Sequence, residues 1–276
     1  MLPAVNFHLW KFCNYKCRFC FAGFDDVPGQ LRREPALRII EALARYGCDK
    51  LTFVGGEPTL CPFLGDLVEH AAARNITTCV VSNGERLRPL IEQHATALHW
   101  IGLSVDSCDE ATSQRLGRGQ GNHIDRSIEL ADLARQHGIR IKLNTVVTAQ
   151  NHHEDMTALV RRLRPERWKI FQVLPIAGQN DGIEPLLVST PQFRSYVERH
   201  AHLAGPGLDV VAEDNAAMTG SYIMIDPMGR FFDNVDGRLI YGPPILDVGV
   251  ERAFASVRFE RERLVARGGL YPWRRR

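Results

Sequence analysis

The sequence predicts an α/β fold, a partial (βα)6 barrel followed by a C-terminal extension. Short apolar, β-branched runs alternate with longer helix-patterned stretches from residue 4 to about residue 203. The runs show little alternation of apolar and polar residues, as expected of parallel strands covered on both faces. Six such units are too few for a full eight-stranded barrel. An open, partial barrel is therefore favoured over a doubly wound open sheet.

Each expected strand is followed by an expected helix. The strands are Val5–Trp10, Lys50–Val54, Thr77–Ser82, Trp100–Val105, Arg140–Val147 and Trp168–Leu174. The helices are Pro35–Tyr46, Pro62–Arg74, Arg86–His94, His123–His137, His153–Leu163 and Pro191–His202. Gly47 and Gly138 stand where helix C-caps form, and Pro35 and Pro62 suit the first turn of a helix.

The pattern changes from Gly205 onward. The expected segments are two short strands about a Pro-Met-Gly turn in 222–232, helices at Val250–Phe254 and Arg258–Ala266, and a basic tail at 268–276. No internal repeat or low-complexity linker separates the two parts of the chain. We therefore expect a core, 1–203, and an extension, 204–276, that closes over the site as part of the same structural unit.

The composition excludes several classes of protein. Of the 276 residues, 45% are apolar and 24% are charged, so the chain is not disordered, collagen-like or a coiled coil. A net charge of +2 is too small to indicate nucleic-acid wrapping, and we expect no DNA or RNA partner. No apolar run approaches the roughly 18 residues of a membrane span. Residues 1–6 lack a secretory signal pattern, so we expect a cytoplasmic protein without membrane attachment.

Three of the seven cysteines, Cys13, Cys17 and Cys20, fall within eight residues directly after the first expected strand. An odd number of cysteines without a secretory signal argues against a disulfide framework. Clustered thiolates suit a soft metal or an iron–sulfur cluster. A zinc site needs a fourth ligand, and the nearby candidate, His8, is poorly placed by strand geometry. Three ligands on a four-iron cluster leave one iron open to a chelating molecule.

Small polar residues follow the next three expected strands. Gly55-Gly-Glu-Pro58 ends the second strand, Ser82-Asn83 the third and Ser104 the fourth. Each segment alone is also typical of an ordinary turn between a strand and a helix. Two adjacent glycines allow the backbone to approach a ligand closely. Together the segments favour a ligand site at the carboxyl ends of the strands.

The Cys-x3-Cys-x2-Cys spacing, with Phe19 before the last cysteine, resembles the signature of the radical S-adenosylmethionine (SAM) superfamily. The resemblance implies that Cys13, Cys17 and Cys20 hold a [4Fe-4S] cluster whose open iron is chelated by SAM. An electron then cleaves the sulfonium and gives a 5′-deoxyadenosyl radical. The cofactor-binding residues that it implies are Phe19, Gly55, Gly56, Glu57, Pro58, Ser82, Asn83 and Ser104.

Several further segments together resemble the viperin family. They are Val5–His8, Cys13–Cys17, Gly117–Gly121, Arg167–Gln172, Ser221–Tyr222 and Ile245–Val250. Viperins convert a ribonucleoside triphosphate, typically CTP, into its 3′-deoxy-3′,4′-didehydro analogue, an antiviral chain terminator, by 4′-hydrogen abstraction and loss of water. Only twelve residues precede Cys13, too few for the amphipathic membrane helix of animal viperins. The short tail ending in Arg274–Arg276 and the poorly matching segment 212–219 leave the base open, with UTP or GTP as alternatives to CTP.

Four cations stand in or beside expected strands, where a charge is costly to bury without a partner. They are Lys50, Lys142, Arg167 and Lys169. Arg167 and Lys169 are two residues apart, as are Lys142 and Asn144, so each pair points to one face of its strand. A nucleoside triphosphate carries about four negative charges and needs several converging cations. The viperin resemblance implies that these cations, Asn6 and Asn144 bind the nucleotide; the alternative is a set of strand-end salt bridges or snorkelling lysines.

The viperin resemblance also implies a role for Tyr222 as the group that quenches the substrate radical. Loss of the 3′ hydroxyl as water requires one electron and one proton, and a phenol can supply both. The alternative is a tyrosine that only packs against the barrel mouth.

Two other functions compete with nucleotide dehydration. Radical SAM enzymes for GTP cyclisation or peptide modification use C-terminal cysteines for auxiliary clusters, and here none lies beyond Cys108. A non-catalytic iron–sulfur protein would need neither the Gly55–Pro58 motif nor the cations. We also expect a flavodoxin- or ferredoxin-like electron donor and a monomer.

Overall fold

The computed structural model describes residues 2–274, so Arg275 and Arg276 of the expected tail lie outside the described residues. One sheet runs through the described chain in the order β10-β9-β8-β1-β2-β3-β4-β5-β6-β7. Its strands are β1 (Val5–Trp10), β2 (Lys50–Gly55), β3 (Thr77–Ser82), β4 (Trp100–Ser104), β5 (Arg140–Val147), β6 (Arg167–Gln172), β7 (Asp209–Glu213), β8 (Met224–Ile225), β9 (Arg230–Asp233) and β10 (Ile240–Pro244). Neighbours from β1 to β7 pair in parallel, β8 pairs in parallel with β1, and β9 and β10 are antiparallel.

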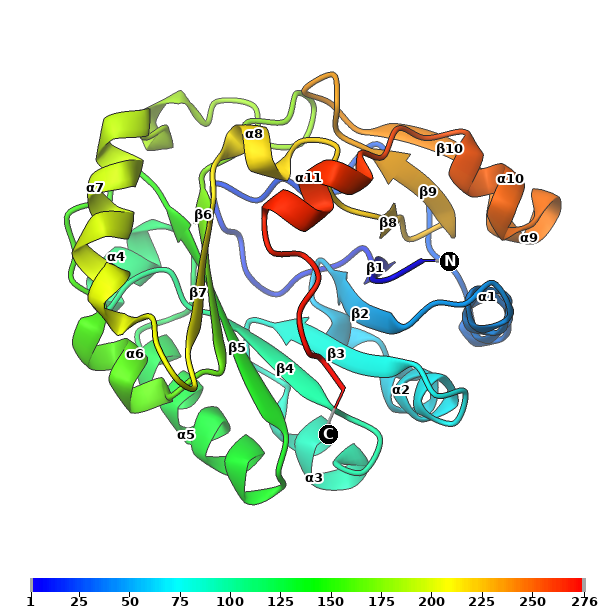
Figure 1. Ribbon diagram of the computed structural model, residues 1–276, viewed down its shortest axis with the longest axis horizontal. Helices are drawn as coiled ribbons and strands as arrows, with labels where there is room; N and C mark the ends of the chain where they lie inside the picture. Colours follow the sequence, from blue (N-terminus) through cyan, green and yellow to red (C-terminus); the bar gives the residue numbers. More distant parts are fainter. Residues whose placement is uncertain (1, 275–276) are drawn as a thin grey trace.

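The sheet curves around a central space, and helices cover its outer side (Figure 1). The main helices are α1 (Arg33–Arg45), α2 (Leu64–Ala72), α3 (Arg88–His94), α4 (Glu110–Arg115), α5 (His123–Gln136), α6 (Thr157–Leu163) and α7 (Thr190–His200). The short helices of the extension are α8 (Asn215–Met218), α9 (Ile245–Val248), α10 (Val250–Ala255) and α11 (Arg261–Ala266). The predicted α/β fold with a parallel sheet is confirmed.

The six strands predicted from the sequence lie within two residues of their predicted bounds, whereas β7 was not predicted. This strand is at the edge of the sheet, and Glu213 is its one fully buried residue. It therefore lacks the continuous apolar run that marks a strand covered on both faces. Helices α4, α8 and α9 were also missed, since helices of four to six residues carry little periodic signal.

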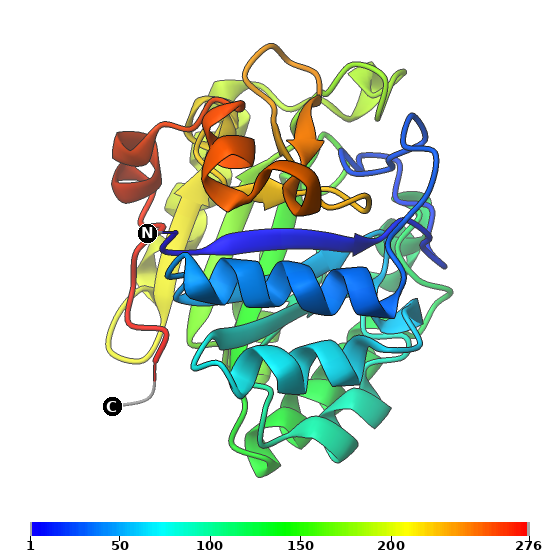
Figure 2. The same ribbon diagram turned by 90° about the vertical axis from the view of Figure 1, so that its right-hand side faces the viewer.

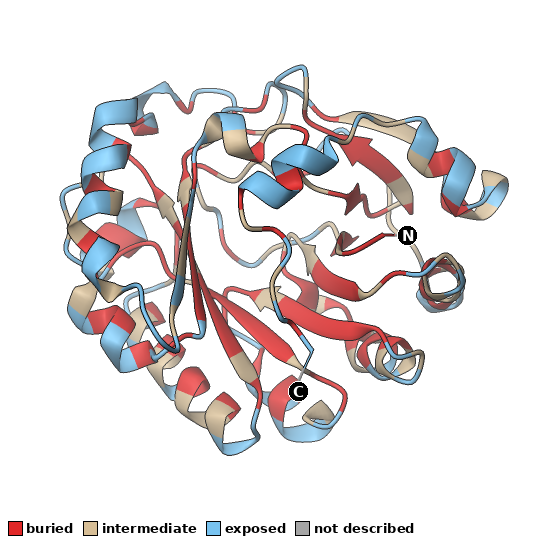
Figure 3. Cartoon of the chain, viewed as in Figure 1, coloured by how far each residue is buried: buried red, intermediate tan, exposed pale blue. Residues whose placement is uncertain are grey.

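Several strands alternate more than expected from the sequence, with an outer apolar layer under the helices and an inner face that carries polar side chains. In β1, Val5, Phe7 and Leu9 are fully buried in the main core under the helices. Successive side chains point to opposite faces of a strand, so Asn6 and His8 face the inside of the barrel. Figure 3 shows that burial is concentrated on the strands and on the inner faces of the helices. The interior is thus available for polar chemistry.

The two ends of the barrel carry different segments. The loop after β1 lies at the carboxyl end, and the chain after α11 crosses the amino end, as Figure 2 shows from the side. No helix among residues 2–274 is both long enough and apolar enough to cross a membrane.

Candidate active site

A cavity of about 300 Å³ occupies the inside of the barrel. It is lined by the three clustered cysteines, by Tyr222, and by all four of the strand cations selected from the sequence. The other selected residues that line it are Asn6, Phe19, Gly55, Gly56, Glu57, Ser82, Asn83, Ser104 and Asn144. Pro58 does not line it; this residue begins the short 3-10 turn η1 (Pro58–Leu60). Folding therefore brings almost the whole selected set into one space.

The cysteine loop is braced by the Gly-rich segment that follows α4. The backbone N–H of Lys16 donates to the carbonyl of Gly117 at 3.3 Å, and that of Arg18 donates to the carbonyl of Leu116 at 3.0 Å. Gly117 has φ +79°, and a Cβ there would overlap the carbonyl oxygen of Lys16. Glycine is required at this position both by the backbone conformation and by the close approach of the cysteine loop.

The thiols of Cys13, Cys17 and Cys20 are free, and burial raises the pKa of all three, that of Cys17 to about 12. They would thus be protonated without a metal, and metal binding would displace the protons. No group of three or more Cys, His, Asp or Glu side chains in residues 2–274 surrounds a position for a single ion. A four-iron cluster is wider than one ion and needs ligands spaced further apart. Three thiols on one cavity wall fit such a cluster.

His8 lies inside the barrel in an aromatic environment. Its ring makes edge contacts with Phe21, Phe24 and Phe232, with centroids 5.1 to 6.3 Å apart. Burial lowers its pKa to about 3, so the imidazole is neutral. Its Nδ1 has no hydrogen-bond partner among the described residues.

The Gly55-Gly56 pair makes close approaches that differ from those expected. A Cβ on Gly56 would lie 2.5 Å from the carbonyl oxygens of both Lys11 and Phe12, and one on Gly55 would lie 2.9 Å from the backbone nitrogen of Trp10. The N–H of Gly56 donates to the carbonyl of Trp10 at 2.6 Å. The backbone that packs closely against these glycines is therefore that of Trp10–Phe12, where the loop carrying the three cysteines begins. That the glycines also contact a bound ligand stays a prediction.

The Glu57 carboxylate joins the ends of β2 and β3. It accepts hydrogen bonds from the backbone and hydroxyl of Thr59, from the Ser82 hydroxyl at 2.7 Å and from the Asn83 N–H at 2.8 Å. Burial raises its pKa, although these bonds oppose the rise. The motif thus fixes the rim on which Ser82 and Asn83 stand.

An ion pair that sequence reasoning missed lies beside the cysteine loop. The Arg118 guanidinium donates to Asp106 at 2.6 Å and lies 5.5 Å from the centre of the Phe19 ring. Both charged residues are buried and line the cavity. A sequence signal was available, because Arg118 lies in the Gly117–Gly121 segment that carries part of the viperin resemblance.

All four strand cations are buried, and Lys50, Arg167 and Lys169 contact partners from the C-terminal part of the chain. Lys50 lies 4.5 Å from the centre of the Tyr271 ring and contacts its hydroxyl. Arg167 pairs with Asp209 and donates to the carbonyl of Gly268. Burial lowers the pKa of Lys50 to about 8 and lowers the pKa values of Lys142 and Lys169. An anionic ligand beside these buried cations would stabilise their charged forms.

Tyr222 stands next to these cations. Its hydroxyl accepts a hydrogen bond from the Lys169 ammonium at 2.5 Å and donates one to Glu213. The Arg267 guanidinium lies 3.7 Å from the centre of its ring. Burial raises the pKa of Tyr222 well above its usual value, so the phenol keeps its proton. Glu213 was missed because it lies in the unpredicted strand β7, and Arg267 was missed because it lies between the last expected helix and the expected tail.

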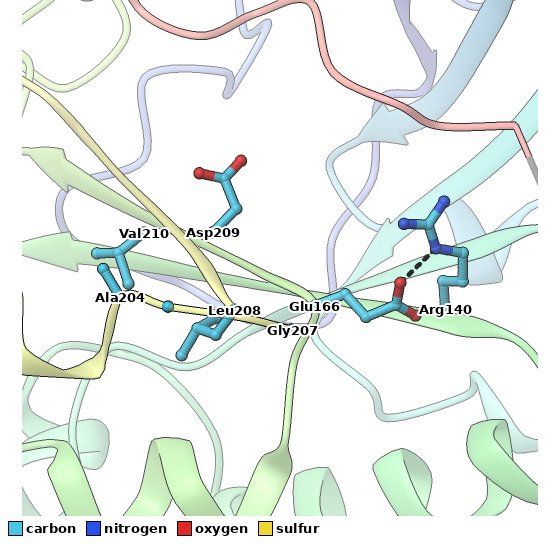
Figure 4. Close-up of a pocket in the computed structure, with 8 residues that line it drawn as sticks. Arg140, Glu166, Ala204, Gly207, Leu208, Asp209 and Val210 are labelled. Atoms are coloured by element: carbon cyan, nitrogen blue, oxygen red, sulfur yellow. Dashed lines mark hydrogen bonds and ion pairs between the residues drawn. The ribbon is translucent and has the colours of Figure 1, made fainter.

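A second hollow, of about 460 Å³, lies outside the barrel where β5, β6 and β7 begin. Figure 4 shows its lining, with the Arg140–Glu166 ion pair on one side and residues of the 204–210 segment on the other. None of the residues selected from the sequence lines it.

The chain is similar to known radical SAM proteins. The family model described as the radical SAM superfamily matches residues 8–163. An S-adenosylmethionine-dependent nucleotide dehydratase of Flammeovirga pacifica is 43% identical, with 99% of this chain and 97% of that protein covered. A protein of the same name from Lacinutrix mariniflava is 37% identical over 99% of this chain, which spans 59% of that protein. The solved structure of anSMEcpe with bound AdoMet and a Cp18Cys peptide superposes with a TM-score of 0.72 at 16% identity, covering 92% of this chain and 80% of that one.

Proposed function

The chain belongs to the radical SAM superfamily and to its viperin-like, SAM-dependent nucleotide dehydratases, and from this membership we propose which nucleotide it dehydrates and how. The substrate is a ribonucleoside triphosphate, CTP in preference to UTP or GTP. The product is the 3′-deoxy-3′,4′-didehydro analogue, which terminates a growing viral chain.

The observation that carries this proposal is a single cavity with two chemically different ends. Three thiols line it from the loop after β1, and four buried cations line it from strands β2, β5 and β6. A ligand in this space would place phosphates among the cations and its sugar nearer the thiols. Such a separation of charge from redox chemistry suits a nucleotide better than a peptide.

The residues present fit the family's [4Fe-4S] cluster and SAM. Cys13, Cys17 and Cys20 would hold the cluster through thiolates, and the rim built by Glu57 and Ser82 would hold SAM. When bound, the reduced cluster and SAM supply a 5′-deoxyadenosyl radical that takes a hydrogen atom from the sugar. Electrons would come from a flavodoxin- or ferredoxin-like donor to a monomeric enzyme.

The cations and two asparagines orient the substrate in this proposal. Charge-assisted hydrogen bonds from lysine and arginine to phosphate are worth about 1.5–3 kcal/mol each. Asn6 and Asn144 face the same interior, and the Asn144 Oδ1 is buried without a partner among residues 2–274. A buried, unpaired acceptor is costly, so a donor on the sugar or base would relieve that cost.

Tyr222 is the proposed source of the electron and proton that complete the reaction. The 4′ radical loses its 3′ hydroxyl, one proton converts this group to water, and one electron closes the 3′,4′ double bond. The phenol would supply both and become a phenoxyl radical, which the electron donor then reduces. Its position on the cavity wall beside Lys169 supports this role.

The proposal is tested with the reconstituted, reduced protein under anaerobic conditions. It is incubated with SAM and each of CTP, UTP, GTP and ATP, and the products are analysed by mass spectrometry. We expect 5′-deoxyadenosine together with a nucleotide lighter by one water, most abundantly from CTP. Cleavage of SAM without dehydration of any of the four nucleotides would refute it.

A further inference from the structure

Glu213, the last residue of β7, is a fully buried carboxylate beside the cavity-lining cations Lys169 and Arg267. Its oxygens lie 2.5 Å from the Lys169 ammonium and 3.3 Å from the Arg267 guanidinium, and it accepts the hydroxyl proton of Tyr222 in a hydrogen bond. These three partners line the cavity, whereas Glu213 stands behind them. Any effect of Glu213 on a bound molecule is therefore exerted through them.

The part of the cavity around Lys169 carries more positive than negative charge. Five buried cations line it: Lys50, Lys142, Arg167, Lys169 and Arg267. The carboxylates that pair with them among residues 2–274 are Glu213, with no exposure, and Asp209, whose side chain is 54% exposed. Although burial favours the neutral acid, Lys169 and Arg267 hold the pKa of Glu213 below its usual value. A permanent negative charge thus stands behind the site.

We propose that Glu213 is a positioning residue whose negative charge has two roles. It neutralises part of the charge of Lys169 and Arg267 while the site holds no phosphate. It also orients the Tyr222 hydroxyl for dehydration. This inference rests on the proposed function and extends it to a residue that touches neither cofactor nor substrate. Phosphates entering the site compete with Glu213 for its two cations. Glu213 thereby lowers the affinity for nucleotide, while it keeps the Tyr222 hydroxyl in a fixed orientation.

The proposal predicts opposite changes in binding and in chemistry for Glu213→Gln. This variant keeps the shape of the side chain and removes its charge, so Lys169 and Arg267 become freer to bind phosphate. We expect nucleotide to bind at least about threefold more tightly, because an anion close to both cations has been removed. Cleavage of SAM continues, and dehydrated nucleotide per 5′-deoxyadenosine falls about tenfold, because a weaker neutral acceptor now faces Tyr222.

Asp209→Asn is the matched control. It removes one negative charge from the same strand and from a neighbouring cation, Arg167, without contacting Tyr222. We expect this variant to keep the parent ratio of dehydrated nucleotide to 5′-deoxyadenosine.

Glu213→Asp serves as a second variant if the glutamine protein does not fold. It keeps the charge and retracts the carboxylate by one methylene, so affinity stays within about twofold of the parent while the product ratio falls.

Binding is measured by calorimetry with CTP on the reconstituted protein, and the product ratio is measured by mass spectrometry. Tighter binding with a lower ratio in Glu213→Gln supports the proposal. Unchanged binding, or a loss of both affinity and turnover as expected of a purely structural residue, overturns it. If the parent binds CTP but dehydrates nothing, the proposed function is at fault, and the binding comparison still tests the charge of Glu213.

Discussion

Replacing Gly117 by alanine should displace the loop that carries the three clustered cysteines. Gly117 has φ +79°, and a Cβ built on it would overlap the Lys16 carbonyl oxygen and lie 2.7 Å from its carbon. Real Cβ atoms essentially never come within 3.0 Å of a heavy atom outside their own and adjacent residues, and ordinary contact begins near 3.4 Å. Because the obstacle is backbone, no side-chain rotation can relieve it.

The magnitude follows from the conformation and from two hydrogen bonds. A residue with a Cβ in the left-handed region costs about 1–2 kcal/mol. Moving the loop away also weakens the bonds from Lys16 to Gly117 and from Arg18 to Leu116, at 3.3 and 3.0 Å, each worth about 0.5–1.5 kcal/mol. We therefore expect Gly117→Ala to lose about 2–5 kcal/mol of unfolding free energy and to bind less iron.

Gly178→Ala is the control that separates the cost of the backbone conformation from the cost of the steric overlap. Gly178 has the same φ of +79°, but nothing lies within 4 Å of where its Cβ would stand. This variant should lose only about 1–2 kcal/mol and keep the parent iron content. Unfolding free energy is measured in urea, and iron per chain is measured after anaerobic reconstitution. Equal losses in the two variants, with full iron in Gly117→Ala, would show that the loop does not depend on this contact.

Four further outcomes follow. Cys17→Ala should abolish the brown chromophore and 5′-deoxyadenosine formation, and retention of about four irons per chain would contradict the ligand assignment. Lys169→Ala or Arg167→Ala should weaken nucleotide binding at least about tenfold while uncoupled SAM cleavage persists; equal affinity of the parent for nucleoside and triphosphate would argue against a phosphate site. Tyr222→Phe should still form 5′-deoxyadenosine with little dehydrated nucleotide, and product at the parent rate would reduce Tyr222 to scaffolding. Because the pKa of His8 falls from 6.5 to about 3 on folding, the unfolded chain binds one more proton than the folded chain between these pH values. The free energy of unfolding should therefore drop by up to about 1.4 kcal/mol per pH unit below pH 6.5. His8→Asn should flatten that slope, as measured by urea unfolding at several pH values.

The candidate site could be predicted from the sequence wherever its residues follow a strand or alternate along one. Lys142 and Asn144 share a face of β5, and Arg167 and Lys169 share a face of β6. Alternation in a strand has a strict period of two, so a charged residue within an apolar run already indicates a polar interior. The motif after β2 was found in the same way, but its glycines accommodate the protein's own backbone, which only coordinates can show.

The sequence by itself determined the parallel α/β fold, the cysteine loop and the inward-facing cations, because each rests on a spacing of a few residues. Tertiary structure decided which anions and aromatic rings meet those cations. Lys50 and Tyr271 lie 221 positions apart, and Lys169 meets Glu213 only because β7 pairs with β6 at the edge of the sheet. No local pattern encodes such partners, since their approach depends on how the whole sheet curves and on where the tail crosses it. Glu213 could therefore not be predicted as a functional residue from the sequence, because its partners are defined only by the folded sheet.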